Sequence, residues 1–151
     1  MLDDPLTDGG AAPFRLPSGL GVFGRPGKLL LSAALTEEGG HACYPGREIE
    51  EITVELPPGA ALVTLPRDVT EQAGGASYHS RSRLTDGVLE VQREFSLSTP
   101  HQVCTQAEFD QMRPVLAAAK RDARTQISLT RSEPQQLARA PAGELSDLKR
   151  P

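Results

Sequence analysis

The chain has 151 residues and a formal net charge of −4, with 20 acidic and 16 basic side chains. A length of this order suits a single domain. The acidic balance argues against a nucleic-acid-binding protein, which needs an excess of basic side chains to displace counterions. The 14 glycines and 13 prolines predict many turns and argue against an all-helical bundle.

Neither a membrane span nor a signal peptide is expected. The longest apolar run covers residues 29–35, which is too short to cross a bilayer as a helix. The first ten residues, MLDDPLTDGG, are acidic and polar, whereas a signal peptide begins with basic residues and continues with an apolar segment. We therefore expect a soluble and cytoplasmic chain, unless the sequence is a fragment of a longer exported protein.

The first predicted elements are an arm and three strands. Residues 1–27 are rich in glycine and proline, which predicts an extended arm that can lie over the body of the domain. The compact apolar run at residues 28–35 has strand length. In residues 48–56 apolar and polar side chains alternate, which predicts a half-buried strand. A Pro-Pro-Gly turn then joins it to a short strand at residues 60–65.

A hairpin is predicted in the middle of the chain. Asp86 and Gly87 separate two alternating segments, residues 76–84 and 88–98, and glycine accepts the positive φ that a tight turn requires. In the second strand five side chains share one face: Leu89, Val91, Arg93, Phe95 and Leu97. In the first strand the candidates for the core are Tyr78 and Leu84, and those for the outer face are His79, Arg81 and Arg83.

The C-terminal part is predicted to begin with a capped helix. Thr105 and Glu108 have the spacing of a capping box, in which each side chain accepts a backbone N–H. A helical stripe of apolar residues follows: Phe109, Met112, Val115, Leu116, Ala119 and Ala123. Pro114 lies within this stripe and predicts a kink or two shorter helices. Residues 125–130 are predicted to form a last strand, and residues 132–151 a disordered or weakly helical tail.

Together these elements predict a mainly β fold. We expect a small β-sandwich of antiparallel strands over residues 28–131, with one helix at about residues 105–123 near the C-terminal end. Residues 1–27 form the arm of this domain, and residues 132–151 form its tail.

Six short motifs occur in order along residues 42–130. They are Tyr44-Pro45, the strand and turn at residues 54–59, Leu65-Pro66, the strand at residues 89–93, Phe109 at the head of the helix, and Ile127-Ser128-Leu129. In this order they resemble the C-terminal β domain, a domain of unknown function, that accompanies bacterial transglutaminase-like proteins. We assign structural roles to Tyr44, Pro57, Gly59, Pro66, Gly87, Arg93 and Phe109.

The motif of that family's catalytic domain is missing from this sequence. The catalytic domain uses a nucleophilic cysteine at the start of a helix with a histidine and an aspartate, and neither Cys43 nor Cys104 has the surrounding motif. The resemblance therefore implies a non-catalytic structural or interaction domain. Its expected partner is a transglutaminase-like catalytic domain, in the same chain or in another one. No enzyme activity, cofactor or nucleic-acid partner is expected.

The candidates for chemistry are two histidines and two cysteines: His41, Cys43, His101 and Cys104. Zinc binds thiolates and imidazoles in tetrahedral sites, so a small-ligand or metal-binding module that uses these four residues is the alternative function. Cys43 and Cys104 could instead form a disulfide. Cys104 could also act as a nucleophile, because a helix N-terminus lowers a thiol pKa and His101 is close in sequence. The structural alternative is two loop histidines and two buried cysteines.

Arg93 is the one charged residue on an otherwise apolar strand face. Burying an unpaired guanidinium is costly, so we expect Arg93 to extend to solvent or to pair with a carboxylate such as Glu108 or Asp110. Contact with an external anion is the functional alternative. A second group of cations is expected on a solvated side of the helix: Arg113, Lys120, Arg121 and Arg124.

Overall fold

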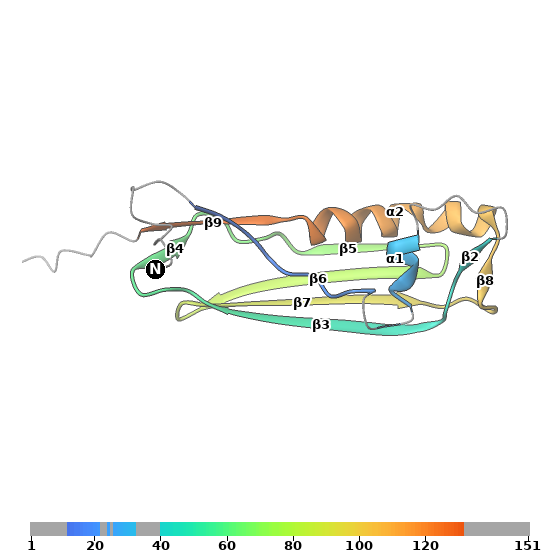
Figure 1. Cartoon of the computed structure of the whole chain (residues 1–151), viewed down its shortest axis with the longest axis horizontal. Helices are drawn as coiled ribbons and strands as arrows, with labels where there is room; N and C mark the ends of the chain where they lie inside the picture. The colour runs from blue at the N-terminus through green and yellow to red at the C-terminus, as the bar shows by residue number, and fades with distance from the viewer. Residues whose placement is uncertain (1–11, 22–23, 25, 33–39, 132–151) are drawn as a thin grey trace, which may run out of the picture.

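The computed structural model describes residues 12–21, 24, 26–32 and 40–131 (Figure 1). Its largest element is a four-stranded antiparallel sheet in the order β3-β7-β6-β5. These strands are β3 (Gly46–Glu55), β5 (Val69–Ala73), β6 (Ala76–Thr85) and β7 (Val88–Leu97). The expected mainly β class, with antiparallel sheets and one main helix near the C-terminal end, is confirmed.

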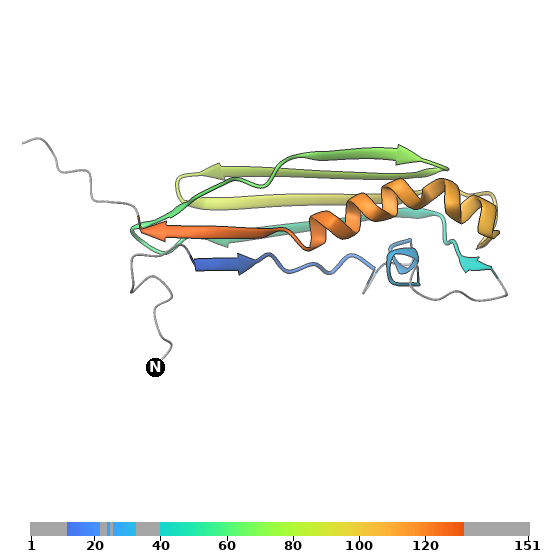
Figure 2. The ribbon, with the colours of Figure 1, turned by 90° about the horizontal axis from the view of Figure 1, so that it is seen from above.

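A second layer packs on one face of this sheet. One half of the layer is a helix, and the other half is a three-stranded sheet (Figure 2). Helix α2 (Gln106–Ala123) packs on β5 and β6 and leads into β9 (Gln126–Arg131). On either side of β9 lie β1 (Ala12–Arg15) and β4 (Ala60–Leu62). Part of the predicted arm, β1, is therefore paired into a sheet. The predicted tail lies outside the described residues.

Three smaller elements lie in the half of the molecule that contains α2 (Figure 1). They are the short helix α1 (Lys28–Ser32) and the two-stranded pair β2 (His41–Ala42) and β8 (Val103–Cys104). Leu29 and Leu30 of α1 are buried in the same cluster as the apolar side of α2. This short helix and the β2–β8 pair thus complete the core at the end of the sheet that β9 does not reach.

The central hairpin forms as predicted. β6 and β7 pair in register from Thr85↔Val88 onward, and the turn residues Asp86 and Gly87 have φ of +49° and +78°. A second tight turn, Gly74-Gly75 with φ of +59° and +81°, joins β5 to β6. Strand β5 was not expected from the sequence, because its five residues have apolar side chains only at the two ends and so lack a clear alternation.

Several predicted elements are corrected by the structure. Residues 28–32 form helix α1, where a strand was predicted, because the run is rich in leucine and lacks the β-branched residues that favour strands. The strand predicted at 60–65 ends at Leu62. Leu84 was expected in the core but is 41% exposed, because it lies next to the hairpin turn, beyond the part of β6 that α2 covers.

Helix α2 is continuous through Pro114, so the alternative of two shorter helices is wrong. Pro114 lies on the exposed side of α2, where water can satisfy the carbonyl that lacks a proline N–H partner. The predicted capping box is confirmed: the Thr105 hydroxyl accepts the Glu108 N–H, and the Glu108 carboxylate accepts the Thr105 N–H. Such caps stabilise a helix by about 1 kcal/mol.

The core consists of two apolar clusters, and both include side chains of β7. One lies under α2 and α1 and includes Tyr78, Phe95 and Met112. The other lies under β1 and β9 and includes Leu16, Val91 and Ile127. Arg93 stands between Val91 and Phe95 on the same face of β7, and its side chain is 1% exposed. The two clusters are therefore separated by a buried charge.

Candidate functional site

The four residues proposed for chemistry meet at the end of the molecule where α2 begins. In the β2–β8 pair His41 lies opposite Cys104, and Cys43 directly follows β2. Cys43 and Cys104 form a disulfide, with sulfur atoms 2.05 Å apart and Cα atoms 5.7 Å apart. A sulfur atom in a disulfide is neither a thiolate ligand nor a nucleophile. In this oxidised form neither cysteine binds a metal or attacks a substrate.

The two histidines have different neighbours. The His41 ring is buried and stacks on Phe109, with ring centroids 3.9 Å apart, and its Nε2 lies 3.0 Å from Gln106 Oε1. His101 is exposed, and its Nε2 lies 3.0 Å from Glu108 Oε1. His41 is therefore part of the packing of α2, whereas His101 lies at the surface beside the first turn of the helix.

Glu108 joins this group, although the sequence analysis assigned it only to the helix cap. The ligand atoms of His101, Cys104 and Glu108 all lie within 4.8 Å of one another. The pKa of the Glu108 carboxyl is lowered, first by the backbone N–H of Thr105 and then by His101. The carboxylate is therefore held in its charged form at this position. The sequence signal was present, because Glu108 and His101 flank Cys104 by a few residues on either side.

The partners of Arg93 differ from those predicted. Its Nε donates to Asp122 Oδ2 at 3.0 Å, and its Nη1 donates to Glu50 Oε2 at 3.0 Å and to the Pro17 carbonyl at 2.9 Å. Glu108 and Asp110 lie at the opposite end of α2 and could not reach it. Burial alone would lower the pKa of Arg93, but the hydrogen bond with Glu50 and the charge of Asp122 raise it overall. Within the described residues, each nitrogen of the Arg93 guanidinium therefore has a hydrogen-bond acceptor.

Asp122 also binds Tyr78, whose hydroxyl donates to Oδ2 at 2.6 Å. Burial raises the pKa of Tyr78 well above its usual value of about 10, and the hydrogen bond and charge of Asp122 raise it further. Asp122 thus connects the last turn of α2 to β6 by its hydrogen bond with Tyr78, and to β7 by its ion pair with Arg93.

The raised pKa of Tyr78 predicts an alkaline loss of stability. Above about pH 10 the unfolded chain releases the phenol proton while the folded chain keeps it, so the free energy of unfolding falls as the pH rises. Urea denaturation at pH values between 8 and 11 measures this slope. The Tyr78→Phe variant is expected to lose part of the slope, and Tyr44→Phe, at the other tyrosine, is expected to keep it. Equal slopes in wild type and Tyr78→Phe would contradict the prediction.

Two glutamates of β3 hold the N-terminal segment. Glu48 Oε1 accepts the N–H groups of Gly21 and Gly24 at 2.9 and 3.2 Å, and Oε2 accepts that of Gly27 at 3.0 Å. Glu50 accepts the N–H of Gly19 and also pairs with Arg93. Neither residue was predicted from the sequence as a functional position. Both alternate with the outward-facing residues of β3 and share the face of Ile52, which indicates carboxylates on the covered face of the sheet.

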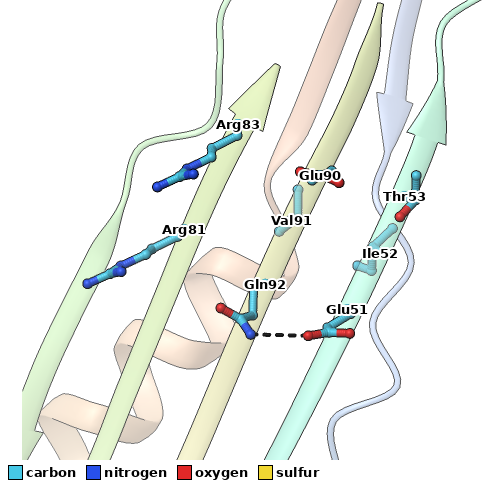
Figure 3. A pocket seen from close by; sticks show the side chains of 8 residues that line it. All are labelled: Glu51, Ile52, Thr53, Arg81, Arg83, Glu90, Val91 and Gln92. Carbon is cyan, nitrogen blue, oxygen red and sulfur yellow. Dashed lines mark hydrogen bonds between the residues drawn. The ribbon is translucent and has the colours of Figure 1, made fainter. Parts of the chain in front are cut away.

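The other face of the four-stranded sheet is not covered by any helix or strand of the described residues (Figure 2). Almost all side chains on this face are polar. They include His79, Arg81 and Arg83, which were predicted to face outward. A shallow hollow of about 410 Å³ lies on this face across β3, β7 and β6. Glu51, Glu90, Gln92, Arg81 and Arg83 line it, and Gln92 Nε2 donates to Glu51 Oε1 at 3.2 Å (Figure 3).

On β6 and β7 the charges of this outer face are sorted by strand, whereas β3 carries both Arg47 and Glu51 there. β6 contributes Arg81 and Arg83, whereas β7 contributes Glu90 and Glu94. Arg83 lies opposite Glu90 in the β6–β7 register, yet neither Arg81 nor Arg83 forms an ion pair with any residue that the structure describes. Both arginine side chains extend away from β7, toward β5 (Figure 3). The face therefore presents two unpaired cations beside the carboxylates of β7, of which Glu94 already pairs with Arg47 of β3.

The remaining predicted structural positions lie in turns and in the core. Pro57 and Gly59 are in the connection from β3 to β4, where Gly59 has φ of +75°. Pro66 is in the connection from β4 to β5, and Tyr44 precedes β3. Phe109 is 6% exposed under His41. These locations agree with structural roles but test no function.

A scan against protein-family models, a search of curated proteins and a search of solved structures each returned no match. The resemblance to the domain that accompanies transglutaminase-like proteins therefore rests on the sequence motifs alone. None of the helices in the described residues is both long and apolar enough to span a bilayer.

Proposed function

We propose that this chain is a non-catalytic interaction domain that binds a partner protein through the outer face of its four-stranded sheet. The observation that carries the proposal is the pair of unpaired cations, Arg81 and Arg83, beside the carboxylates of β7 on an uncovered face. A partner with the opposite arrangement of charges would form ion pairs with both rows. Such complementarity selects a partner and speeds association.

The size of the face suits this role. Its three ten-residue strands alone cover roughly 34 by 14 Å, or about 500 Å². A standard protein interface buries roughly 800 Å² on each partner. The face therefore supplies more than half of such an interface before the neighbouring β5 and the connections are counted.

Three of the four residues proposed for chemistry, His41, Cys43 and Cys104, are buried and engaged with other side chains, which also supports a non-catalytic role. The cysteine sulfurs are joined to each other, and the His41 ring is stacked on Phe109. The choice of partner comes from the sequence resemblance. We propose a transglutaminase-like catalytic domain, either joined to this domain or encoded separately in the same genome.

The test is binding of the purified chain to that catalytic domain by isothermal titration calorimetry. A 1:1 complex is expected, and Arg81→Glu with Arg83→Glu should weaken it by roughly tenfold or more, since two attractive contacts become repulsive. A matched control, Lys28→Glu with Arg121→Glu, makes the same change in net charge at exposed positions of the helical layer. Absence of binding, or equal weakening by both double variants, would overturn the proposal.

A further inference from the structure

We propose that reduction of the Cys43–Cys104 disulfide converts this end of the molecule into a zinc site formed by Cys43, Cys104, His101 and Glu108. The inference is independent of the sheet-face interaction, because the two sites lie on different parts of the fold. It rests on His101, Cys104 and Glu108, whose ligand atoms lie within 4.8 Å of one another, and on Cys43, which the disulfide places beside Cys104. Thiolate, imidazole and carboxylate are all established zinc ligands.

The distances suit a tetrahedral ion. On zinc, nitrogen and oxygen ligands lie about 3.3 Å from each other, and two thiolates about 3.8 Å. His101 Nε2 and Glu108 Oε1 are already 3.0 Å apart, and both lie within 4.8 Å of Cys104 Sγ. The two sulfurs are 2.05 Å apart while bonded. Reduction frees the two cysteine side chains to rotate about their Cα–Cβ bonds, so that each sulfur can turn toward the ion.

The surroundings position the ligands and leave a route for the ion. Glu108 Oε2 accepts the Thr105 N–H at 2.8 Å, which orients the carboxylate so that both of its oxygens lie close to His101 Nε2, Oε1 at 3.0 Å and Oε2 at 3.1 Å. A hydrogen bond of this kind fixes a metal ligand in place. The side chains of His101 and Glu108 are 45% and 35% exposed, so an ion can reach them from solvent. His41 is excluded from the set because it stacks on Phe109 and faces Gln106.

The chemistry balances with a dithiol as reductant. The dithiol supplies two electrons and two protons and becomes a disulfide itself, while the bond between Cys43 and Cys104 breaks to give two thiols. Zinc then displaces the two thiol protons, which are released to solvent. Before reduction only His101 and Glu108 can bind, and two ligands are too few for a stable zinc site. Binding is therefore expected in the reduced chain alone.

Cobalt(II) titration of the whole chain tests the proposal, because tetrahedral cobalt has visible bands and thiolate ligands add a near-ultraviolet charge-transfer band. The chain is first reduced with a water-soluble phosphine, which is oxidised to its oxide and does not compete for the metal as a dithiol would. The reduced chain is expected to bind one cobalt ion, which zinc then displaces. The oxidised chain is expected to show neither band.

Single substitutions identify the ligands. In the reduced state His101→Ala and Glu108→Gln are each expected to weaken binding by roughly tenfold or more, and glutamine keeps the helix cap. Cys43→Ser should halve the charge-transfer band. His79→Ala, at an exposed histidine of the sheet, is the matched control and should bind as wild type.

Three results would overturn the proposal. The first is a reduced chain without the tetrahedral spectrum. The second is equal binding by wild type, His101→Ala and Glu108→Gln. The third is cobalt binding by a reduced chain that far-ultraviolet circular dichroism shows to be unfolded and to remain unfolded when the metal is added.

Discussion

Replacing Asp122 by alanine is expected to lower the free energy of unfolding by about 3–5 kcal/mol, because it leaves the buried charge of Arg93 without the more deeply buried of its two carboxylate partners. Asp122 Oδ2 accepts from both Arg93 Nε and the Tyr78 hydroxyl, and the side chains of Asp122 and Arg93 are 5% and 1% exposed. The remaining carboxylate partner of Arg93, Glu50, also accepts an N–H of the N-terminal segment. Water cannot replace the lost carboxylate at a site with so little solvent access.

Urea denaturation of the wild type and the variant measures this loss. Arg47→Met is the control, because it breaks the Arg47–Glu94 ion pair, in which Arg47 is exposed, and should leave the midpoint almost unchanged. The double variant Arg93→Met with Asp122→Leu removes both charges and is expected to be more stable than Asp122→Ala. A loss below about 1 kcal/mol for Asp122→Ala would show that the network adds little to stability.

Removing the disulfide is the other large effect. The bond joins residues 61 positions apart, and the loop-closure entropy for a loop of that length corresponds to about 4 kcal/mol at 25 °C. The variant Cys43→Ala with Cys104→Ala should therefore unfold at a much lower urea concentration than the oxidised wild type. The β2–β8 pair, which has only two residues in each strand, is expected to be the first part to lose structure.

Two comparisons check the origin of this loss. Wild type in excess phosphine, without metal, should match the double alanine variant, because both lack the cross-link. Hydrogen exchange should show faster exchange in β2 and β8 while the N–H groups in the middle of β6 and β7 stay protected. If the reduced and oxidised wild type unfolded at the same urea concentration, the predicted stabilisation by the cross-link would be wrong.

The sequence patterns that led to correct predictions involve residues that lie close together in the sequence. The alternation along β7 placed Arg93 and four apolar residues on one face, and all five are at most 3% exposed. The Asp86-Gly87 turn and the Thr105 capping box follow from local backbone requirements that any fold must meet. The sequence by itself therefore determined the hairpin, the start of α2 and the mainly β class.

The fold brought together groups that no local pattern could pair. Arg93 was expected to find a carboxylate, but its partners come from the last turn of α2 and from β3, because these are the elements that pack on β7. Residues 28–32 became helical at the end of the sheet, where leucines on one side of a helix fill the core. The three N–H groups that donate to Glu48 belong to a segment more than twenty residues away in the sequence.

For the candidate sites as well, the sequence indicated which residues could take part, and the tertiary structure decided how they are arranged. His41, Cys43, His101 and Cys104 could be chosen from their chemistry, but whether two cysteines form a bond depends on the distance between their Cα atoms, which the β2–β8 pair sets at 5.7 Å. Sequence alternation placed Arg81 and Arg83 on the outer face of the sheet. Only the tertiary structure left that face uncovered, because α2 and β9 bury their apolar sides against the other face.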